Sequence, residues 1–389
     1  MNQTRRHRVE ILQQRGVIIP TPETVEIETH VNLDRLSGGV LLHSGTKLFG
    51  DQTMISQNCD IGREGPVTIQ DCYVGPGVQL KAGYFKNAVF LEGASLGYGA
   101  HVREGTILEE QASTAHCVGL KQTILMPFVT LGSLINFCDG MMAGGTSRED
   151  HSEVGSSFIH FNFTPNQDKA TPSLLGDVPN GVMMNQRPIF MGGQGGLVGP
   201  CRIAYGTVSA AGTIVRKDQL KPDHLIIGGA GKGGSIPWKA GSIGVSTRIL
   251  KNNLIYIGNL FALREWYRHI RRIFISSRFP EALWQGLIKT LDLGMDERFK
   301  RLRAYINGIG ELTLADQYSV FEQQYHKRDQ DLGDIELRDQ FMHQLELFKS
   351  QHDNYVETIK ALPYETTQIG TLWLQGVVDR VVSDGGLAS

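Results

Sequence analysis

Residues 147–169, SREDHSEVGSSFIHFNFTPNQDK, gather side-chain types that can do chemistry. The segment contains two histidines, His151 and His160, among acidic and basic residues, asparagines and serines. Imidazole and carboxylate groups are the usual carriers of protons in catalysis. The segment is therefore either part of an active site or a polar corner of a structural repeat. The sequence on either side of it distinguishes the two interpretations.

Metal binding is the first chemistry to test, because Glu149, Asp150, His151 and His160 are all possible ligands. Adjacent residues of a strand point to opposite faces, which separates the first three. The chain has no HxH, HExxH or CxxC spacing, and these are the patterns in which such ligands usually converge. The sequence therefore predicts no metal site.

Charge and composition exclude several classes of partner. The chain of 389 residues has 38 Lys and Arg against 40 Asp and Glu, a net charge of -2, which gives no electrostatic footprint for nucleic acid or an anionic membrane. No stretch approaches 18 uninterrupted apolar residues, the length of a membrane span. Five scattered cysteines favour free, mostly buried thiols in a reducing compartment. We expect a cytoplasmic protein.

A six-residue repeat is the strongest structural signal in the sequence. Residues 90–113 divide into FLEGAS, LGYGAH, VREGTI and LEEQAS, with a large apolar residue first and a small residue fifth. The pattern returns at 191–214 as MGGQGG, LVGPCR, IAYGTV and SAAGTI. A period of six fits neither an amphipathic helix nor an alternating strand. It is typical of the left-handed parallel β-helix, in which three hexapeptides make one triangular coil.

The rest of the chain divides by composition and period. Glycine totals 46 residues and becomes sparse after residue 245, where helical spacing of apolar residues begins. We expect a lead-in helix over 1–15, a β-helix over 16–249 with a long loop insertion around 114–189, and a helical domain over 250–389. Helices are predicted at 281–306, 311–330 and 334–362, and the basic run 268–272 is predicted to be a solvated helix face.

Four motifs of this chain carry a resemblance to a known family. They are LQQRGVIIPTPETVEI (12–27), MPFVTLG with INFCDG (126–140), NFTPNQDKAT (162–171) and FMGGQGGLVGPCRIAYGTVSAAGTIVRKD (190–218). Their order and spacing resemble the β-helical acetyltransferase half of bacterial bifunctional enzymes that make UDP-N-acetylglucosamine, over residues 12–230. No counterpart of the glycine-rich, basic loop of the uridyltransferase half occurs in the chain, so nucleotidyltransferase activity is not expected.

The resemblance assigns roles to residues of the opening segment. It implies a histidine base, for which His151, within DHSE, and His160, two residues before Asn162, are the candidates. Asn162 matches the asparagine that contacts substrate. Thr130 and the pair Met141–Met142 replace the family's phosphate-binding Arg and Lys, so that Arg148 and Lys169 are the candidate substitutes.

The resemblance also implies a cofactor and an assembly. The small residues Gly193, Ala210 and Ala211 would line the path of the pantetheine arm of acetyl-CoA or another acyl-CoA. The fold implies a homotrimer, and the implied acceptor is a sugar or sugar nucleotide. The alternative is a β-helix that binds a sugar nucleotide or serves as an oligomeric scaffold without catalysis, because Phe163 and Thr164 replace the family's Tyr and Asp.

Overall fold

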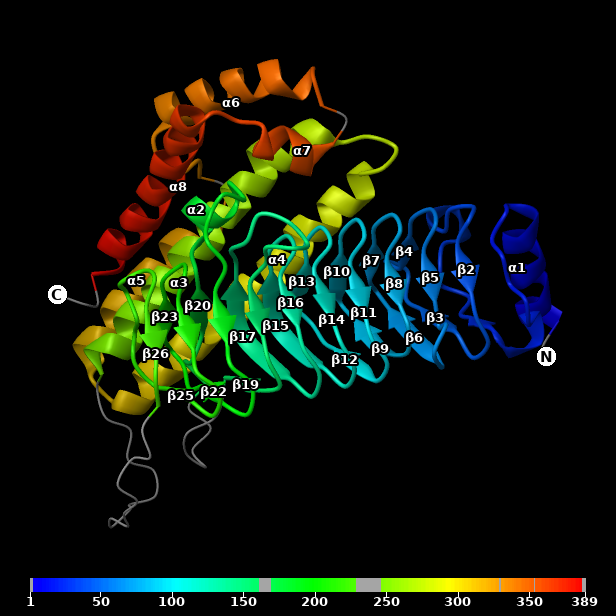
Figure 1. Ribbon diagram of the computed structural model, residues 1–389, viewed down its shortest axis with the longest axis horizontal. Coiled ribbons are helices and arrows are strands. Elements are labelled where there is room, and N and C mark those ends of the chain that lie inside the picture. The colour runs from blue at the N-terminus through cyan, green and yellow to red at the C-terminus, as the bar shows by residue number, and fades with distance from the viewer. Residues whose placement is uncertain (1–2, 161–168, 229–245, 329, 353, 387–389) are drawn as a thin grey trace, which may run out of the picture.

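Short parallel strands stack in register along the glycine-rich part of the chain (Figure 1). The structure is a computed structural model that describes residues 3–160, 169–228, 246–328, 330–352 and 354–386. Helix α1 (Gln3–Gln14) lies at the N-terminal end of the stack, where Val9 and Leu12 are buried. Two short 3-10 helices, η1 (Pro22–Thr24) and η2 (Leu33–Arg35), belong to the first coils.

Each coil visits three faces in turn, and we number the faces in chain order. The first face is the ten-stranded sheet. Its strands are β2 (Leu41–Leu42), β5 (Asp60–Ile61), β8 (Gln79–Leu80), β11 (Ser95–Leu96), β14 (Ser113–Thr114), β16 (Thr130–Leu131), β18 (Glu153–Val154), β21 (Phe190–Met191), β24 (Val208–Ser209) and β26 (Leu225–Ile226).

The second and third faces are joined into one sheet because β15 (Gly119–Leu125) and β17 (Asn136–Met142) turn the corner between them without a break. The second face contains the first halves of these two strands with β1 (Glu26–Ile27), β3 (Lys47–Phe49), β6 (Val67–Gln70), β9 (Gly83–Lys86), β12 (Ala100–Val102), β19 (Phe158–Ile159), β22 (Gly196–Leu197) and β25 (Ile214–Val215). The third face contains the second halves with β4 (Met54–Ile55), β7 (Tyr73–Val74), β10 (Ala88–Phe90), β13 (Thr106–Leu108), β20 (Ser173–Leu175) and β23 (Arg202–Ile203).

The core of the coil contains the leading residue of each predicted hexapeptide. Phe90, Leu96, Val102 and Leu108 are all 0% exposed, and so is the small residue Ala94. Successive coils place like residues above one another; Leu80, for example, pairs with Leu96 in the neighbouring strand. The predicted fold class, a left-handed parallel β-helix of hexapeptide repeats followed by a helical region, is confirmed.

Strands continue through the segment predicted to hold a long insertion. β14 to β20 lie within 113–175; residues 161–168, between β19 and β20, are outside the described ranges, and additional residues form enlarged corners at 143–152 and 176–189. The last of these contains the short helix α2 (Val178–Gly181). Residues 147–152 of the polar segment lie in the first of these corners, and its next residues form β18 and β19.

A pair of long helices lies along the third face. Helix α3 (Thr247–Glu265) continues as a π-helical turn (Trp266–Ile270) and a 3-10 turn (Arg271–Phe274), and α4 (Glu281–Ile309) returns in the opposite direction. We call residues 247–309 the hairpin. A Cβ atom on Gly286 of α4 would lie 2.4 Å from the ring of Tyr73, so the helix approaches the sheet as closely as a glycine allows.

The outward side chains explain why the hairpin packs on this face. On the third face they form a ladder of neighbouring apolar residues that are buried although they point away from the coil, namely Val89, Ile107, Ile124, Met141 and Leu174. Burying one such side chain contributes about 1.5–3 kcal/mol. The hairpin is therefore part of the core.

The remaining helices cover the outer side of the hairpin (Figure 1). They are α5 (Leu312–His326), α6 (Ile335–Lys349), α7 (Tyr355–Lys360) and α8 (Tyr364–Gly385). Asp334 caps α6 by accepting from the backbone N–H groups of Glu336 and Leu337, as expected for an acid at this position. The prediction of one helix over 334–362 was wrong, because the chain turns after α6 and α7 starts at a new cap, Asn354. No helix in the described ranges is long and apolar enough to cross a membrane.

Acidic residues at the corners of the coil hold the hairpin on both edges of the third face. At the edge between the third and first faces, Tyr267 donates to Glu109, Arg271 to Glu110 and Arg278 to Glu92. At the edge between the second and third faces, Arg298 donates to Asp139. The prediction of a solvated face for residues 268–272 was wrong for Arg271, which is 1% exposed.

Glu109 makes the stability of this junction depend on pH. Burial, reinforced by the neighbouring charge of Glu110, raises its pKa from 4.5 to about 7. The folded protein then binds a proton that the unfolded chain has released, so this group lowers the free energy of unfolding as pH rises from 4.5 to about 7. Glu109→Gln should remove that contribution, as measured by urea unfolding across the pH range. The exposed Glu346→Gln is the control, and an unchanged pH slope in Glu109→Gln would contradict the assignment.

Candidate functional site

The best-formed polar cluster surrounds His160, at the corner between the second and third faces. The imidazole Nε2 lies 3.3 Å from Asp139 Oδ2, and Nδ1 is hydrogen-bonded to the hydroxyl of Thr171. Asp139 sits where β17 turns from one face to the next, and Thr171 lies just before β20. Backbone geometry restricts the histidine as well, because His160 has a φ of 74°.

His160 is poised to be neutral at physiological pH. Burial lowers its pKa below 6.5, and although the carboxylate of Asp139 opposes that change, Arg298 and Lys169 add to it. A neutral imidazole has one nitrogen that donates and one that accepts. With Nε2 donating to Asp139, Nδ1 is the basic nitrogen and accepts from Thr171.

The helical region supplies the other side of this cluster. Arg298 of α4 is 2% exposed and binds the second oxygen of Asp139, while Tyr256 of α3 is buried beside the pair. The Nε and Nη1 atoms of Arg298 are buried without a hydrogen-bond partner among the described residues. The groups therefore lie in the order Thr171 hydroxyl, His160 imidazole, Asp139 carboxylate and Arg298 guanidinium. The imidazole can accept a proton, and the carboxylate then stabilises the positive charge that forms.

One further predicted residue, Lys169, belongs to the same corner. Lys169 is half-buried, and its charge is close enough to lower the pKa of His160. Asn162, the predicted substrate contact, lies outside the described residues. Sequence reasoning missed Asp139, Thr171 and Arg298; the first two were within the quoted motifs INFCDG and NFTPNQDKAT, whereas nothing in the sequence pointed to Arg298.

His151 lies at a different corner, between the third and first faces. It pairs with Gly145 in an isolated antiparallel bridge, and its Nδ1 is buried without a hydrogen-bond partner among the described residues. The adjacent Asp150 does not orient the ring, because its carboxylate accepts from the hydroxyl of Thr146 at 2.8 Å. His151 therefore lacks the oriented pairing that His160 has.

Arg148 anchors the loop that carries His151. Its Nη1 donates to the carbonyl oxygens of Gln111 and Phe128, at 3.0 and 2.8 Å, and to the hydroxyl of Thr130 at 3.0 Å. Thr130 is the residue at which the motif resemblance places the family's phosphate-binding arginine. The guanidinium of Arg148 thus lies next to Thr130, and its Nη1 is already hydrogen-bonded to the coil.

The residues predicted to line the acyl-CoA path lie together at the third corner, between the first and second faces. The carbonyl of Gly193 accepts from the N–H of Gly212 at 2.9 Å, in the turn that also contains Ala210 and Ala211. Ala210 is half-buried and Ala211 exposed. A Cβ on Gly155 would lie 2.7 Å from the nitrogen of Gly193, so the close stacking of these turns requires glycine at position 155.

The predicted residues thus occupy three different corners of the coil. His160 and Lys169 share one corner, Arg148 and His151 a second, and Gly193, Ala210 and Ala211 the third. A side of six residues is about 20 Å long at ~3.3 Å per residue. One chain therefore does not bring the candidate base and the candidate cofactor path together.

Among the described residues, the candidate metal cluster is not in this segment. It consists of Glu265, His269 and Asp331, in the helical region. Arg268 lies 3.2 Å from Glu265 and 3.4 Å from Asp331, and Arg338 is 3.0 Å from Asp331. Because these two cations already balance the two carboxylates, the cluster is suited to ion pairing within the protein.

Arg298→Met tests the linkage between the hairpin and His160. Removing one partner of a buried ion pair leaves Asp139 uncompensated and should cost about 3 kcal/mol of stability. The pKa of His160 should rise, because the nearby positive charge is lost and Asp139 is free to pair with the imidazolium. Histidine titration by NMR and urea unfolding measure the two effects. The control is Arg303→Met, whose exposed ion pair with Glu322 is worth at most about 1 kcal/mol; an unchanged His160 pKa in Arg298→Met would refute the linkage.

Comparison with known proteins supports the resemblance seen in the motifs. No protein-family model matches the chain. The Bifunctional protein GlmU of Thermotoga petrophila is 28% identical over 229 residues, 59% of this chain and 46% of that protein. The proteins of the same name from Geotalea uraniireducens and Mycobacterium tuberculosis are 30% and 25% identical, over 58% and 55% of this chain and 44% and 38% of theirs. The chain thus spans less than half the length of these curated relatives.

A solved structure of LpxA from Acinetobacter baumannii aligns over 71% of this chain and 95% of its own, with 13% identity and a TM-score of 0.18. A score this low adds nothing to the fold described above. The sequence relatives carry the comparison, and their matched length is close to that of the β-helix. Over its β-helix, the chain is similar to the acetyltransferase half of the bifunctional UDP-N-acetylglucosamine pyrophosphorylase/glucosamine-1-phosphate acetyltransferase enzymes.

Proposed function

We propose that this protein is an acyltransferase that moves an acyl group from acetyl-CoA or another acyl-CoA to a sugar or sugar nucleotide, with His160 as the general base. The observation that carries the proposal is the oriented, neutral imidazole of His160 between the Asp139 carboxylate and the Thr171 hydroxyl. The similarity of the β-helix to an acetyltransferase domain supplies the reaction class.

The residues of this corner suit the proton transfer that acyl transfer requires. An acceptor hydroxyl or amine loses its proton to His160 Nδ1 through the Thr171 hydroxyl, and its oxygen or nitrogen attacks the thioester carbonyl. The carbon–sulfur bond then breaks, and the coenzyme A thiolate takes up a proton. Asp139 holds the ring in the reactive tautomer and stabilises the imidazolium. Asn162 and Lys169 are proposed to position the acceptor.

The acyl donor is proposed to lie along the corner of Gly193, Ala210 and Ala211, where half-buried and exposed small residues leave room for a pantetheine arm. Because this corner and His160 are on different edges of one coil, a complete site needs the corner of a second copy. A trimer in which each copy supplies one corner to its neighbour satisfies that requirement.

A surface suited to such an assembly exists on the first face. The outward residues Phe190, Val208 and Leu225 pair in neighbouring strands and are 42%, 39% and 58% exposed. Earlier strands of the same face carry polar residues at the equivalent positions, such as Gln79 and Ser95. An exposed apolar patch of this kind is typical of a contact between protein surfaces, and it adjoins the corner of Ala210 and Ala211.

The alternative function is a binding protein or scaffold without catalysis. It is favoured by the fact that both ring nitrogens of His160 already have partners and the side chain is only 13% exposed. In this case the His160 cluster only fixes the hairpin to the coil. Kinetics of single variants separate the two functions.

His160→Gln should lower the rate of coenzyme A release by about 10²–10⁴-fold, the usual contribution of a general base. His151→Gln, at another corner, should retain the wild-type rate within about twofold and is the matched control. The assay detects free thiol with acetyl-CoA and a panel of amino sugars and sugar nucleotides. Equal rates for His160→Gln and the wild type would exclude His160 as the base, and no turnover by the wild type with any acceptor would favour the scaffold.

Val208→Lys should dissociate the proposed trimer, because it places a charge in the centre of the apolar patch. Light scattering after size-exclusion chromatography measures the mass of the assembly, which is three times 43.0 kDa for a trimer. Val320→Lys makes the same change at a residue of α5 that is 67% exposed and should leave the mass unaltered. A trimer that survives Val208→Lys would place the interface elsewhere.

A further inference from the structure

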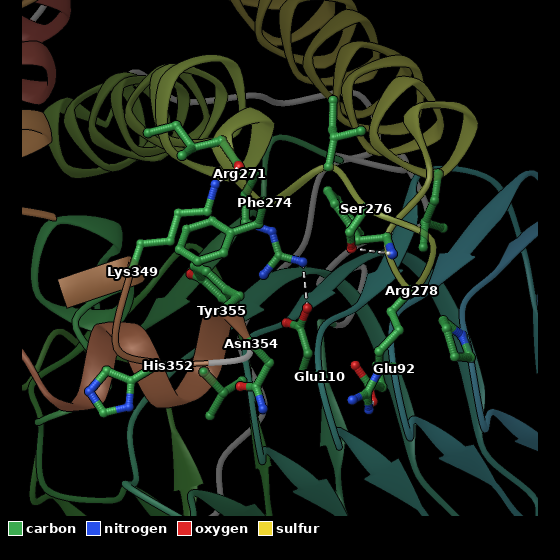
Figure 2. Close-up of a pocket in the computed structure, with 16 residues that line it drawn as sticks. Glu92, Glu110, Arg271, Phe274, Ser276, Arg278, Lys349, His352, Asn354 and Tyr355 are labelled. Atoms are coloured by element: carbon green, nitrogen blue, oxygen red, sulfur yellow. Dashed lines mark hydrogen bonds and ion pairs between the residues drawn. The ribbon is translucent and has the colours of Figure 1, made fainter. Parts of the chain in front are cut away.

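A pocket lies in the junction between the coil and the helical region, at the edge between the third and first faces. Its volume is about 240 Å³, and its lining includes Glu110 of the coil, Arg271 of the hairpin, Lys349 of α6, Tyr355 of α7 and His352 between these two helices. Figure 2 shows these side chains around a common space, with Arg278 and Glu92 at its other side. The pocket is on a different corner from His160, so it is separate from the proposed acyltransferase site.

Arg271 is the central residue of this pocket. Its guanidinium lies between two rings, with its carbon 3.8 Å from the centre of Tyr355 and 4.6 Å from that of Phe279. One nitrogen, Nη2, donates to Glu110. The other two, Nε and Nη1, are buried and lack a hydrogen-bond partner among the described residues, as does Oε2 of Glu110. Buried polar atoms without partners are costly, so the pocket lacks an acceptor for Arg271 and a donor for Glu110.

The charges around the pocket select an anion. Arg271 is paired with Glu110 and Arg278 with Glu92. Lys349 has no carboxylate partner among the described residues; it donates to the carbonyl of Ile273, and its ammonium lies 5.5 Å from the centre of the Phe274 ring. A positive charge is therefore left over beside the free donors of Arg271. Charge-assisted hydrogen bonds from guanidinium and ammonium groups are the usual means of holding phosphates and carboxylates.

We propose that this pocket binds a small metabolite that carries an oxyanion, phosphate or carboxylate, together with a hydroxyl group. The oxyanion accepts from Arg271 Nη1 or Nε and from Lys349, and the hydroxyl donates to Glu110 Oε2. The pocket volume of about 240 Å³ admits a molecule of the size of glycerol 3-phosphate. Because the ligand would touch both the coil and the outer helices, its binding stabilises their junction.

Calorimetry and thermal unfolding of the full chain test the proposal with four probes, namely glycerol 3-phosphate, glycerate, inorganic phosphate and neutral glycerol. At least one of the two hydroxylated anions should bind with millimolar affinity or better and raise the melting temperature, and glycerol should do neither. Preference for glycerol 3-phosphate over glycerate identifies a phosphate, and the reverse a carboxylate. If neither hydroxylated anion binds, or if glycerol binds as well as they do, the proposal is wrong.

Lys349→Met locates the binding. This change keeps the apolar stem and removes the ammonium, and it should weaken the anion's affinity about tenfold, as expected for one charge-assisted contact. The matched control is Lys360→Met on α7, whose ammonium lies over the ring of Phe128, outside the pocket. Unchanged affinity in a folded Lys349→Met would place the anion elsewhere. A crystal soaked with the bound probe supplies a second test, because density away from Arg271 would also overturn the assignment.

Discussion

The rest of the structure depends on the burial of the third face of the coil under the hairpin. A β-helix exposes the outward side chains of all three faces, and on this face a ladder of them is apolar. Removing residues 247–309 would expose that ladder to water. The helical region therefore belongs to the same core as the coil, and a truncation at residue 250 would test folding before it tested function.

The hairpin is attached to both edges of the third face by the same kind of interaction. At each edge a carboxylate of a coil corner meets a buried arginine of the hairpin, Glu110 with Arg271 and Asp139 with Arg298. Buried ion pairs are weak sources of stability because desolvation opposes their attraction, but losing one partner is costly. They fix the position of the hairpin along the coil. One edge also contains an imidazole and a hydroxyl, and the other contains a pocket with unpaired donors, so two polar clusters of different composition adjoin the same kind of attachment.

The environment of His160 also depends on the hairpin, which supplies Arg298 to Asp139. The curated relatives align with this chain over less than half of their own length. In this chain, the guanidinium that polarises Asp139 comes from the helical region. A base whose carboxylate partner is held by a second region depends on that region for its pKa. Regulation or loss of activity through the helical region is thereby built into the proposed mechanism.

The sequence by itself determined the coil. A six-residue repeat with a large apolar residue in first position is typical of a three-sided parallel β-helix. Its inward positions, such as Leu96 and Leu108, are buried as predicted. The motifs also placed His160 and the small residues of 190–218 on that coil. Only the tertiary structure decided which corner each residue occupies, because that depends on the lengths of the enlarged corners, which no periodicity encodes. Only the tertiary structure brought Arg298 to Asp139 and buried Arg271, since these contacts join residues about 160 positions apart. A basic run on a helix looks the same in sequence whether water or a carboxylate of the coil lies opposite it.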